Sequence, residues 1–174
     1  MNLLHDIEPG TKEEMNVIIE IPKDSHNKYE IDKKTGLIKL DRANYSSAAY
    51  PFDYGFVPQT LWDDGDALDV VVLTTYPLSV GILATVRPVG ILHMVDGGEA
   101  DEKVIAVPVD DKRWDEVQNL EDVNKHTLKE IVHFFETYKQ LKGKPSPVEI
   151  NGYEGAEAAK AAFDRARELY NESK

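Results

Sequence analysis

Four carboxylates crowd one short segment of the chain, Asp63-Asp64-Gly65-Asp66-Ala67-Leu68-Asp69, which leads directly into a run of valines. Like charges a few ångströms apart raise one another's pKa and cost stability unless cations or hydrogen-bond donors neutralise them. Gly65 allows a tight turn, which would let Asp64, Asp66 and Asp69 converge on one point. Oxygen ligands without cysteine favour the hard cations Mg²⁺, Mn²⁺ and Ca²⁺. The segment indicates a divalent-metal site, but an acidic surface turn before a strand would have the same composition.

Two other metal-binding motifs share features with this segment. An EF-hand loop needs alternating acidic residues before its glycine and a late glutamate, and Gly65 comes too early for that pattern. The short Asp-x-Asp motif of glycosyltransferases is matched by Asp64 and Asp66, but the alternating α/β pattern of those enzymes is not evident in the sequence. That difference weakens the glycosyltransferase alternative without excluding it.

A second acidic segment runs from Asp96 to Lys103, contains Asp101, and joins two expected strands. Its two glycines, Gly97 and Gly98, predict a tight connection. Taken alone, the segment is typical of a solvated hairpin loop. Its interest lies in combination with the first segment, since a two-metal site needs more carboxylates than one turn can supply.

Cations alternate with acids on the strands expected before these segments. Glu20, Lys28 and Glu30 occupy neighbouring strands, and the pair Asp41-Arg42 ends the next one. Simple cross-strand ion pairing explains such a mixture without any ligand. The same mixture is what phosphoryl transfer requires, because metals bind the carboxylates while Lys and Arg hold the phosphate oxygens.

Tyrosine hydroxyls could add donors to such a site, and histidines are expected not to take part. The candidate tyrosines are Tyr50, Tyr54 and Tyr138, although Tyr138 falls on an apolar helix stripe and is equally typical of a core. His126 and His133 lie on or near that helix without a recognisable zinc spacing. All five histidines are therefore expected to be non-catalytic.

The elements that must position these residues are short strands followed by two helices. β-branched and alternating runs predict strands over 15–21, 28–31, 37–40, 69–74, 82–86, 89–95 and 104–109. Residues 32–36 have turn chemistry and predict a hairpin, whereas residues 45–66 have no clear period and are expected to form a structured loop. The spacing of the strands favours a closed antiparallel barrel.

Helical spacing takes over in the last third of the chain. One predicted helix carries Leu128, Ile131, Val132, Phe135, Tyr138 and Leu141 and is stopped by Gly143 and Pro145. A second predicted helix, over 155–170, is alanine-rich, with a stripe formed by Ala158, Ala162, Ala166 and Leu169. Residues 1–174 are expected to form a single domain, in which the barrel packs against these helices.

Composition excludes several other classes of protein. The 174 residues are 41% hydrophobic and 30% charged, which is typical of a globular domain. A net charge of −12 argues against nucleic acid as a partner, because that binding relies on Lys and Arg neutralising phosphates. The absence of cysteine excludes disulfides and thiolate zinc sites. No signal peptide is recognisable, and Arg87 and Pro88 interrupt the uncharged stretch 77–95, so we expect a cytoplasmic protein without a membrane span.

Several separate motifs, in the same order along the chain, resemble those of the soluble, magnesium-dependent inorganic pyrophosphatases of the cytoplasmic barrel type. The matching motifs are Glu20-Ile21-Pro22, Asn27-Lys28-Tyr29-Glu30, Asp41-Arg42, Tyr50-Pro51 with Asp53-Tyr54-Gly55, Asp64-Gly65-Asp66 with Asp69, Arg87-Pro88-Val89-Gly90, residues 103–108, and His133-Phe134-Phe135 with Tyr138-Lys139. The resemblance runs from about Val17 almost to the C-terminus. The chain departs from the family's usual residues at Ala67, Gly97, Thr137 and Tyr153, none of which removes a proposed catalytic group.

The resemblance implies roles for individual residues. Asp64, Asp69 and Asp101 resemble the ligands of a first metal, with Asp69 bridging to a second. Asp96 and Glu30 resemble ligands of metals that arrive with the substrate, and Glu20 would act on the water around the metals. The residues implied to hold the phosphates are Lys28, Arg42, Tyr54, Tyr138 and Lys139, with Lys103 close by. Asp66 resembles the general base, and Tyr50 resembles a residue that supports the site from behind.

The resemblance also implies a fold and a reaction. The fold is of the α+β class, mainly β: a five-stranded OB-like antiparallel barrel flanked by two C-terminal helices. The reaction is hydrolysis of pyrophosphate to two phosphates by in-line attack of a metal-activated water, without a covalent intermediate, in agreement with the chemistry of two divalent cations on one water. Several Mg²⁺ ions per site, with Mn²⁺ as a substitute, and a homohexamer are implied as well.

Two alternatives of other classes remain at this stage. An OB-type nucleic-acid-binding module would use Phe52, Tyr54 and Phe56 as stacking platforms, but the net charge and the lack of a basic stripe argue against it. A passive divalent-cation-binding protein would need the carboxylates but not the cations Lys28, Arg42 and Lys139. Phosphate release from pyrophosphate, with Mg²⁺ and with a chelator, separates all three.

Overall fold

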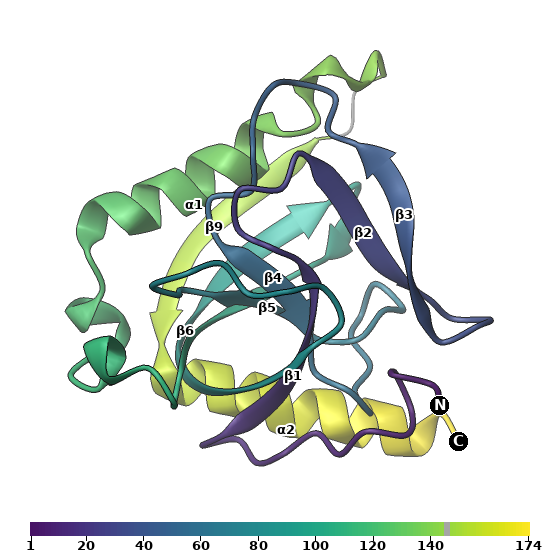
Figure 1. Ribbon diagram of the computed structural model, residues 1–174, viewed down its shortest axis with the longest axis vertical. Helices are drawn as coiled ribbons and strands as arrows, with labels where there is room; N and C mark the ends of the chain where they lie inside the picture. Colours follow the sequence, from purple (N-terminus) through teal and green to yellow (C-terminus); the bar gives the residue numbers. More distant parts are fainter. Residues whose placement is uncertain (145–146) are drawn as a thin grey trace.

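Five strands close into a ring in the computed structural model, which describes residues 1–144 and 147–174 (Figure 1). The ring runs in the order β1 (Met15–Ile21), β4 (Asp53–Phe56), β5 (Asp69–Val72), β8 (Lys103–Pro108) and β6 (Leu83–Asp96). Pairing of β6 with β1 closes it. The pairings within the ring are antiparallel except for β5 with β8, which run parallel. The predicted five-stranded barrel is confirmed, with one parallel pair that the prediction did not contain.

One long strand, β6, replaces the two strands predicted over 82–86 and 89–95. Its pairing with β8 shifts register between Pro88 and Gly90. Proline has no N–H to donate, so it is tolerated in a sheet at such an irregularity, and the strand continues beyond it. The length of β6 lets it pair with β1, β8, the short β7 (Glu99–Ala100) and β9 (Val148–Gly155).

A separate two-stranded sheet stands beside the barrel, formed by β2 (Asn27–Asp32) and β3 (Leu37–Ala43) (Figure 1). The predicted hairpin is therefore confirmed. Its turn is fixed by the Asp32 carboxylate, which accepts hydrogen bonds from the backbone N–H and the hydroxyl of Thr35. The turn ends at Gly36, whose φ of 72° is readily adopted only by glycine.

The predicted loop over 45–66 contains a strand, β4, that the sequence pattern did not reveal. All four of its residues are buried, so the polar–apolar alternation of a half-exposed strand is missing. A Cβ at Gly55 would lie 2.0 Å from the carbonyl oxygen of Ile18 on β1. Glycine therefore allows the close approach of β4 to β1.

The first helix, α1 (Lys125–Thr137), is shorter than predicted. The side chain of Asn124 caps its start by accepting from the backbone N–H groups of His126 and Thr127. Helical conformation ends at Thr137, and a short 3₁₀ turn, η3 (Gln140–Lys142), follows before Gly143. Tyr138 consequently follows the helix instead of lying within it. The predicted stop at Pro145 lies outside the described residues.

Two further 3₁₀ turns, η1 (Lys112–Trp114) and η2 (Leu120–Asp122), precede α1. The strand β9 was not predicted, because none of its residues is fully buried and its sequence contains two glutamates and an Asn-Gly pair that is typical of a turn. The second helix, α2 (Ala156–Glu172), is confirmed close to its predicted bounds. Over the described residues, no helix combines the length and the apolar character needed to cross a membrane.

Among the described residues the core has three parts. The two larger parts lie on opposite sides of the ring's central strands, and the third packs Ile31 and Ile38 of the hairpin against Ile18 and Phe56 of the barrel. Alternate side chains of β5 point to opposite sides, so Val70 and Val72 pack toward α2 while Val71 packs toward α1. The buried face of α2 consists of Ala159, Ala162, Phe163, Ala166 and Tyr170. Ala162 and Ala166 of the predicted stripe are confirmed, whereas Ala158 and Leu169 are only half-buried and their neighbours Ala159 and Tyr170 are buried instead. The α1 side contains the aromatic rings of Tyr50, Phe52 and Tyr54 and therefore supports the charged groups described next.

Candidate active site

Three carboxylates gather at one edge of the barrel. Asp64, Asp69 and Asp101 each offer one oxygen, and these oxygens all lie within 4.8 Å of one another. The parallel pair explains the meeting, because Asp69 begins β5 and is directly opposite Lys103, which begins β8. The first residues of both strands therefore lie at the same edge, with Asp101 just before β8. Such a group of oxygens suits a divalent cation.

The turn that carries Asp64 is closed by its own backbone. The N–H of Trp62 donates to the carbonyl oxygen of Asp66 at 2.7 Å, and the N–H of Gly65 donates to the carbonyl oxygen of Trp62 at 3.0 Å. Gly65 has a φ of 84°, as the sequence led us to expect for a tight turn. The Asp64 carboxylate accepts from the N–H of Asp66 at 3.0 Å, which directs the two side chains differently.

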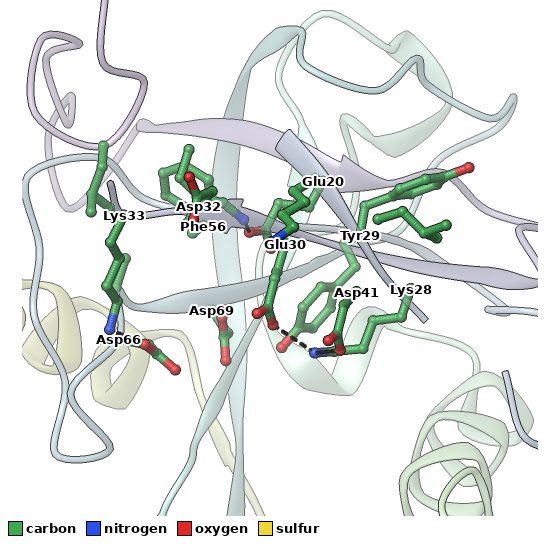
Figure 2. Close-up of a pocket in the computed structure, with 16 residues that line it drawn as sticks. Glu20, Lys28, Tyr29, Glu30, Asp32, Lys33, Asp41, Phe56, Asp66 and Asp69 are labelled. Carbon is green, nitrogen blue, oxygen red and sulfur yellow. Dashed lines mark hydrogen bonds and ion pairs between the residues drawn. The ribbon is translucent and has the colours of Figure 1, made fainter. Parts of the chain in front are cut away.

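Asp66 therefore does not join the three-carboxylate group. Its Oδ1 lies 2.6 Å from the Nζ of Lys33 at the tip of the β2–β3 hairpin, and its side chain is 60% exposed (Figure 2). The expected convergence of Asp64, Asp66 and Asp69 is confirmed for Asp64 and Asp69 only. No feature of the sequence singled out Lys33, because it reads as a turn residue.

One buried lysine lies between two of the three carboxylates. The Nζ of Lys103 donates to Asp69 and to Asp101, at 2.7 Å in each case. Burial lowers the pKa of Lys103, but the charges of Asp69 and Asp101 outweigh it and hold that pKa well above its usual value. The group therefore contains one ammonium and three carboxylate groups, so negative charge remains in excess.

The carboxylates respond to that excess and to burial. Burial, together with the charge of Asp101, raises the pKa of Asp69 to about 6 despite the opposing effect of Lys103. Burial also raises the pKa values of Asp64 and Asp101. A cation placed among these oxygens would relieve the cost of ionising them.

A second charged group covers the hairpin. The Nζ of Lys28 lies 2.8 Å from Glu30 and 2.9 Å from Asp41, and a guanidinium nitrogen of Arg42 lies 3.3 Å from the same Asp41 oxygen. The cross-strand pairing considered for these residues is therefore present. Within the part of the chain that the structure describes, however, Nε and Nη2 of Arg42 are buried without a hydrogen-bond partner. An anion with several oxygens could satisfy both.

A cavity of about 480 Å³ separates the hairpin from the barrel. Figure 2 shows side chains from both sides around it, and its lining includes Glu20, Lys28, Glu30, Asp41, Tyr54, Asp66 and Asp69. Asp41 was recognised only as part of a motif. Lys28 is directly opposite the neighbouring residue, Arg42, and its Nζ reaches the Asp41 carboxylate at 2.9 Å. Burial and the charge of Asp69 raise the pKa of Glu20 to about 8, although its carboxylate accepts from the N–H of Ile31 at 2.7 Å.

Three of the expected site residues, Asp96, Tyr138 and Lys139, lie together beside the hairpin's charged group. The Nζ of Lys139 is 2.5 Å from Asp96 and 5.4 Å from the ring centre of Tyr138. Arg42 lies 5.9 Å from the same ring, which connects these three residues to the hairpin. Tyr138 is 8% exposed and packs on Phe134, so its ring belongs to the core, as one interpretation of the sequence held.

Tyr50 and Tyr54 belong to the aromatic core on which the charged side chains of the site rest. Tyr50 is buried with its ring centre 4.6 Å from that of Phe134 and 6.3 Å from that of Tyr54. Burial raises the pKa of Tyr50 to about 12 and raises that of Tyr54 well above its usual value, so both are neutral hydroxyls. Tyr54 lines the cavity, whereas Tyr50 lies in the aromatic core beneath it.

An OB-like barrel that places grouped carboxylates next to lysine and arginine side chains is the kind of site that metal-dependent enzymes acting on phosphate groups require. The family model described as inorganic pyrophosphatase matches residues 17–171. The chain belongs to the inorganic pyrophosphatase family, and it is an enzyme of the hydrolase class. The family, the fold class and the class of enzyme predicted from the sequence are confirmed.

Individual relatives agree with this assignment. An inorganic pyrophosphatase of Geobacillus stearothermophilus is 51% identical over 160 residues, covering 92% of this chain and 96% of the relative. One from Methanosarcina acetivorans is 50% identical over 90% of this chain and 92% of its own length. Among solved structures, the inorganic pyrophosphatase of Thermus thermophilus is 43% identical, with a TM-score of 0.94 over 98% of this chain and 99% of that one.

Proposed function

We propose that this chain hydrolyses inorganic pyrophosphate to two phosphates in the cavity between the hairpin and the barrel, using Mg²⁺, for which Mn²⁺ can substitute. The observation that carries the proposal is the position of Asp69. It belongs to the three-carboxylate group and also lines the cavity that holds Lys28. A metal ion bound to the three-carboxylate group would therefore contact an anion bound to the basic side chains of the cavity.

The residues fit divalent cations. We propose that Asp64, Asp69 and Asp101 hold the first one, with Asp69 shared toward a second, since an excess of carboxylate over ammonium charge is present among them. Asp96 and Glu30 would hold further cations that enter with the substrate. Bound divalent cations supply neutralising charge and lower the pKa of water in such sites. Glu20, buried and with a raised pKa, would orient water at the barrel side of the cavity.

The positively charged side chains of the site would bind the substrate by exchanging carboxylate partners for phosphate oxygens. Lys139 is paired to Asp96 and Lys28 is paired to Glu30, two carboxylates that the proposal assigns to metals, so both ammonium groups would become available to phosphate oxygens, while Lys28 would keep its contact with Asp41. Arg42 would use Nε and Nη2, which have no hydrogen-bond partner among the described residues, for the same purpose. Tyr54 and Tyr138 would donate hydroxyl hydrogens, and Lys103 would add charge from behind.

Asp66 is the proposed general base. It lines the cavity, stands apart from the three-carboxylate group and retains contact with solvent, so a proton taken from the attacking water could leave. Attack in line with the leaving phosphate then needs no covalent intermediate. Tyr50 would hold the position of Tyr54 without touching substrate.

Phosphate release from pyrophosphate tests this proposal. Activity is expected with Mg²⁺ and with Mn²⁺ and should disappear in excess EDTA, then return when Mg²⁺ is restored. Hydrolysis that continues unchanged in EDTA would contradict the metal assignment. Absence of hydrolysis under every metal condition would favour the passive cation-binding alternative.

We further propose a single domain that assembles as a homohexamer in the cytoplasm. The continuity of the family match supports one domain, and the lack of cysteine is compatible with a reducing compartment. An open groove on the outer side of α1, lined in part by Leu128, Val132, His133 and Tyr153, offers a contact surface. Sedimentation should give the mass of six chains, and Val132→Glu should reduce it where Glu168→Gln, at an exposed position of α2 outside the groove, does not. A monomer at micromolar concentration would overturn this assembly.

A further inference from the structure

Trp62 connects the two acidic segments through its side chain. Its backbone closes the turn that carries Asp64, as described above. Its ring nitrogen Nε1 donates to the Oε2 of Glu102 at 2.7 Å, across 40 positions of sequence. Glu102 follows Asp101 immediately. One hydrogen bond therefore joins the turn that presents Asp64 to the segment that presents Asp101.

The three carboxylates are not positioned equally by the barrel. Asp69 is part of the β5–β8 ladder, where it is directly opposite Lys103. Asp64 lies in the turn outside that ladder, and Asp101 precedes β8. The N–H of Asp101 donates to the carbonyl oxygen of Met94 on β6 at 2.9 Å, so the sheet holds its backbone, whereas Asp64 is held by its own turn. The Trp62–Glu102 hydrogen bond is a side-chain contact that spans these two segments and so limits how far the turn can move from Asp101.

Trp62 and Glu102 each contact a further charged or titratable side chain, Arg165 and His93 respectively. Arg165 of α2 lies 4.8 Å above the Trp62 ring and binds the Asp63 carboxylate with two nitrogens, at 2.6 and 2.9 Å. On the other side, the Oε1 of Glu102 lies 3.8 Å from the Nδ1 of His93. Trp62 is buried and Glu102 is mostly buried, so the bond is shielded from water and its geometry is restricted.

We propose that Trp62 and Glu102 are positioning residues that set the spacing of the Asp64 and Asp101 carboxylates before a cation binds, and thereby set the affinity for the first divalent cation. This inference rests on the proposed function, which makes those carboxylates metal ligands. Neither residue lines the cavity, so they act through their neighbours. Outer partners of metal ligands typically change metal affinity by about 10- to 100-fold when removed.

The two tryptophans of the chain provide a matched comparison. Trp62→Phe removes the N–H donor and keeps an aromatic ring. Trp114→Phe makes the same chemical change at a bond to the Thr75 hydroxyl, 3.3 Å long, outside the acidic segments. Calorimetric titration with Mg²⁺ alone, without pyrophosphate, should show Kd raised about 10-fold or more by Trp62→Phe. Trp114→Phe should leave it unchanged.

The Mg²⁺ dependence of hydrolysis gives a second readout. Trp62→Phe should need more Mg²⁺ for half-maximal rate while kcat at saturating Mg²⁺ approaches that of the unaltered chain, because the reacting groups themselves remain. Thermal unfolding in EDTA measures folding separately. A purely structural role would lower Tm and leave the Mg²⁺ affinity of the folded protein as it was.

Glu102 variants test the other partner. Glu102→Gln and Glu102→Ala lose the same charge, but only glutamine keeps an oxygen that can accept from Trp62. We expect weaker Mg²⁺ binding for Glu102→Ala than for Glu102→Gln, and little further loss when Trp62→Phe is added to Glu102→Ala. If Trp62→Phe does not fold, the comparison of these two Glu102 variants decides the question.

The outcomes separate this inference from the proposed function. If Trp62→Phe and Glu102→Ala bind Mg²⁺ as tightly as Trp114→Phe and Glu102→Gln, the positioning role is wrong while the metal site stands. If the unaltered chain binds no Mg²⁺, the proposed metal site itself is wrong.

Discussion

The Nζ of Lys33 lies 2.6 Å from Oδ1 of Asp66 and 3.0 Å from the carbonyl oxygen of Gly65, which fastens the tip of the β2–β3 hairpin to the acidic turn of the barrel (Figure 2). The hairpin supplies Lys28 and Glu30, and the turn supplies Asp64. This contact therefore joins the two segments that carry these proposed ligands.

Lys33→Met should weaken substrate binding more than folding. The Lys33–Asp66 pair is largely exposed and is expected to contribute at most about 1 kcal/mol to stability. Loss of the contact frees the hairpin tip, so KM for pyrophosphate should rise several-fold while Tm hardly changes. Lys34→Met, at the exposed neighbouring position, is the control. Equal KM values for the two variants would show that the contact does not shape the cavity.

Asp66→Asn and Asp69→Asn should fail in different ways. Asp66→Asn keeps the three-carboxylate group, so Mg²⁺ affinity should persist while kcat falls about 10²–10⁴-fold through loss of the proposed base. Asp69→Asn removes a charge that a cation would need, so Mg²⁺ affinity should decrease, while Tm in EDTA near neutral pH should not fall, because the raised pKa of Asp69 shows that its ionised form is unfavourable in the metal-free fold. Added Mg²⁺ should partly restore the rate of Asp69→Asn only.

Calorimetry with Mg²⁺ and steady-state assays measure both variants. Recovery of Asp66→Asn at high Mg²⁺, together with weakened binding, would make Asp66 a ligand and leave the base to be reassigned.

Glu20 should make the metal-free protein less stable at high pH. Its pKa of about 8 in the folded chain exceeds the usual 4.5, so the folded state binds the extra proton and stability is lost as pH rises between these values. The loss is at most about 1.4 kcal/mol for each pH unit in that window. Glu20→Gln should therefore match the unaltered chain near pH 5 and exceed its stability above about pH 8.

Urea unfolding in EDTA across this pH range measures the effect, with the exposed Glu168→Gln as control. Parallel pH profiles for Glu20→Gln and the unaltered chain would mean that Glu20 does not carry the dependence.

Arg42→Lys should reduce kcat/KM for pyrophosphate by about 10- to 100-fold, since hydrogen bonds to charged groups contribute about 1.5–3 kcal/mol. Lysine keeps the charge but cannot reproduce the planar pair of N–H groups that Arg42 presents at Nε and Nη2, which have no hydrogen-bond partner among the described residues. Arg113→Lys, at an exposed residue of η1 paired with Asp111, should be silent. An Arg42→Lys enzyme with normal kcat/KM would show that positive charge alone suffices.

Local pattern was enough to predict most strands and both helices. The strand over 15–21 was predicted with its observed bounds, because Val and Ile dominate it. A short, fully buried strand such as β4 lacks the alternation of polar and apolar residues that marks a strand in the sequence. The strand β9 contains glutamates and an Asn-Gly pair, so its sequence is not typical of a strand. The end of α1 was overestimated, since Tyr138 continues the apolar spacing after the helical backbone has stopped.

The candidate site was predictable in its residue types but not in its connections. Resemblance to a family grouped Asp64, Asp69 and Asp101, and the structure brings these three together. The parallel pairing that produces the group is invisible in local pattern, because it joins strands separated by the whole of β6. Contacts such as that of Trp62 with Glu102 depend on the same long-range pairing, so sequence alone did not reveal them.

Closure of the barrel by β1 and β6 has a consequence for the order in which the chain folds during synthesis. Met15 pairs with Val86, and Ile18 pairs with Leu83, so β1 cannot complete its pairing until β6 has been synthesised. At roughly 5–20 residues per second, the apolar β1 segment spends several seconds outside the ribosome with an unpaired edge. Unpaired apolar strands recruit other chains. Slow translation of the region before β6 should therefore favour aggregation of nascent chains, even though the finished ring leaves neither edge of β1 unpaired.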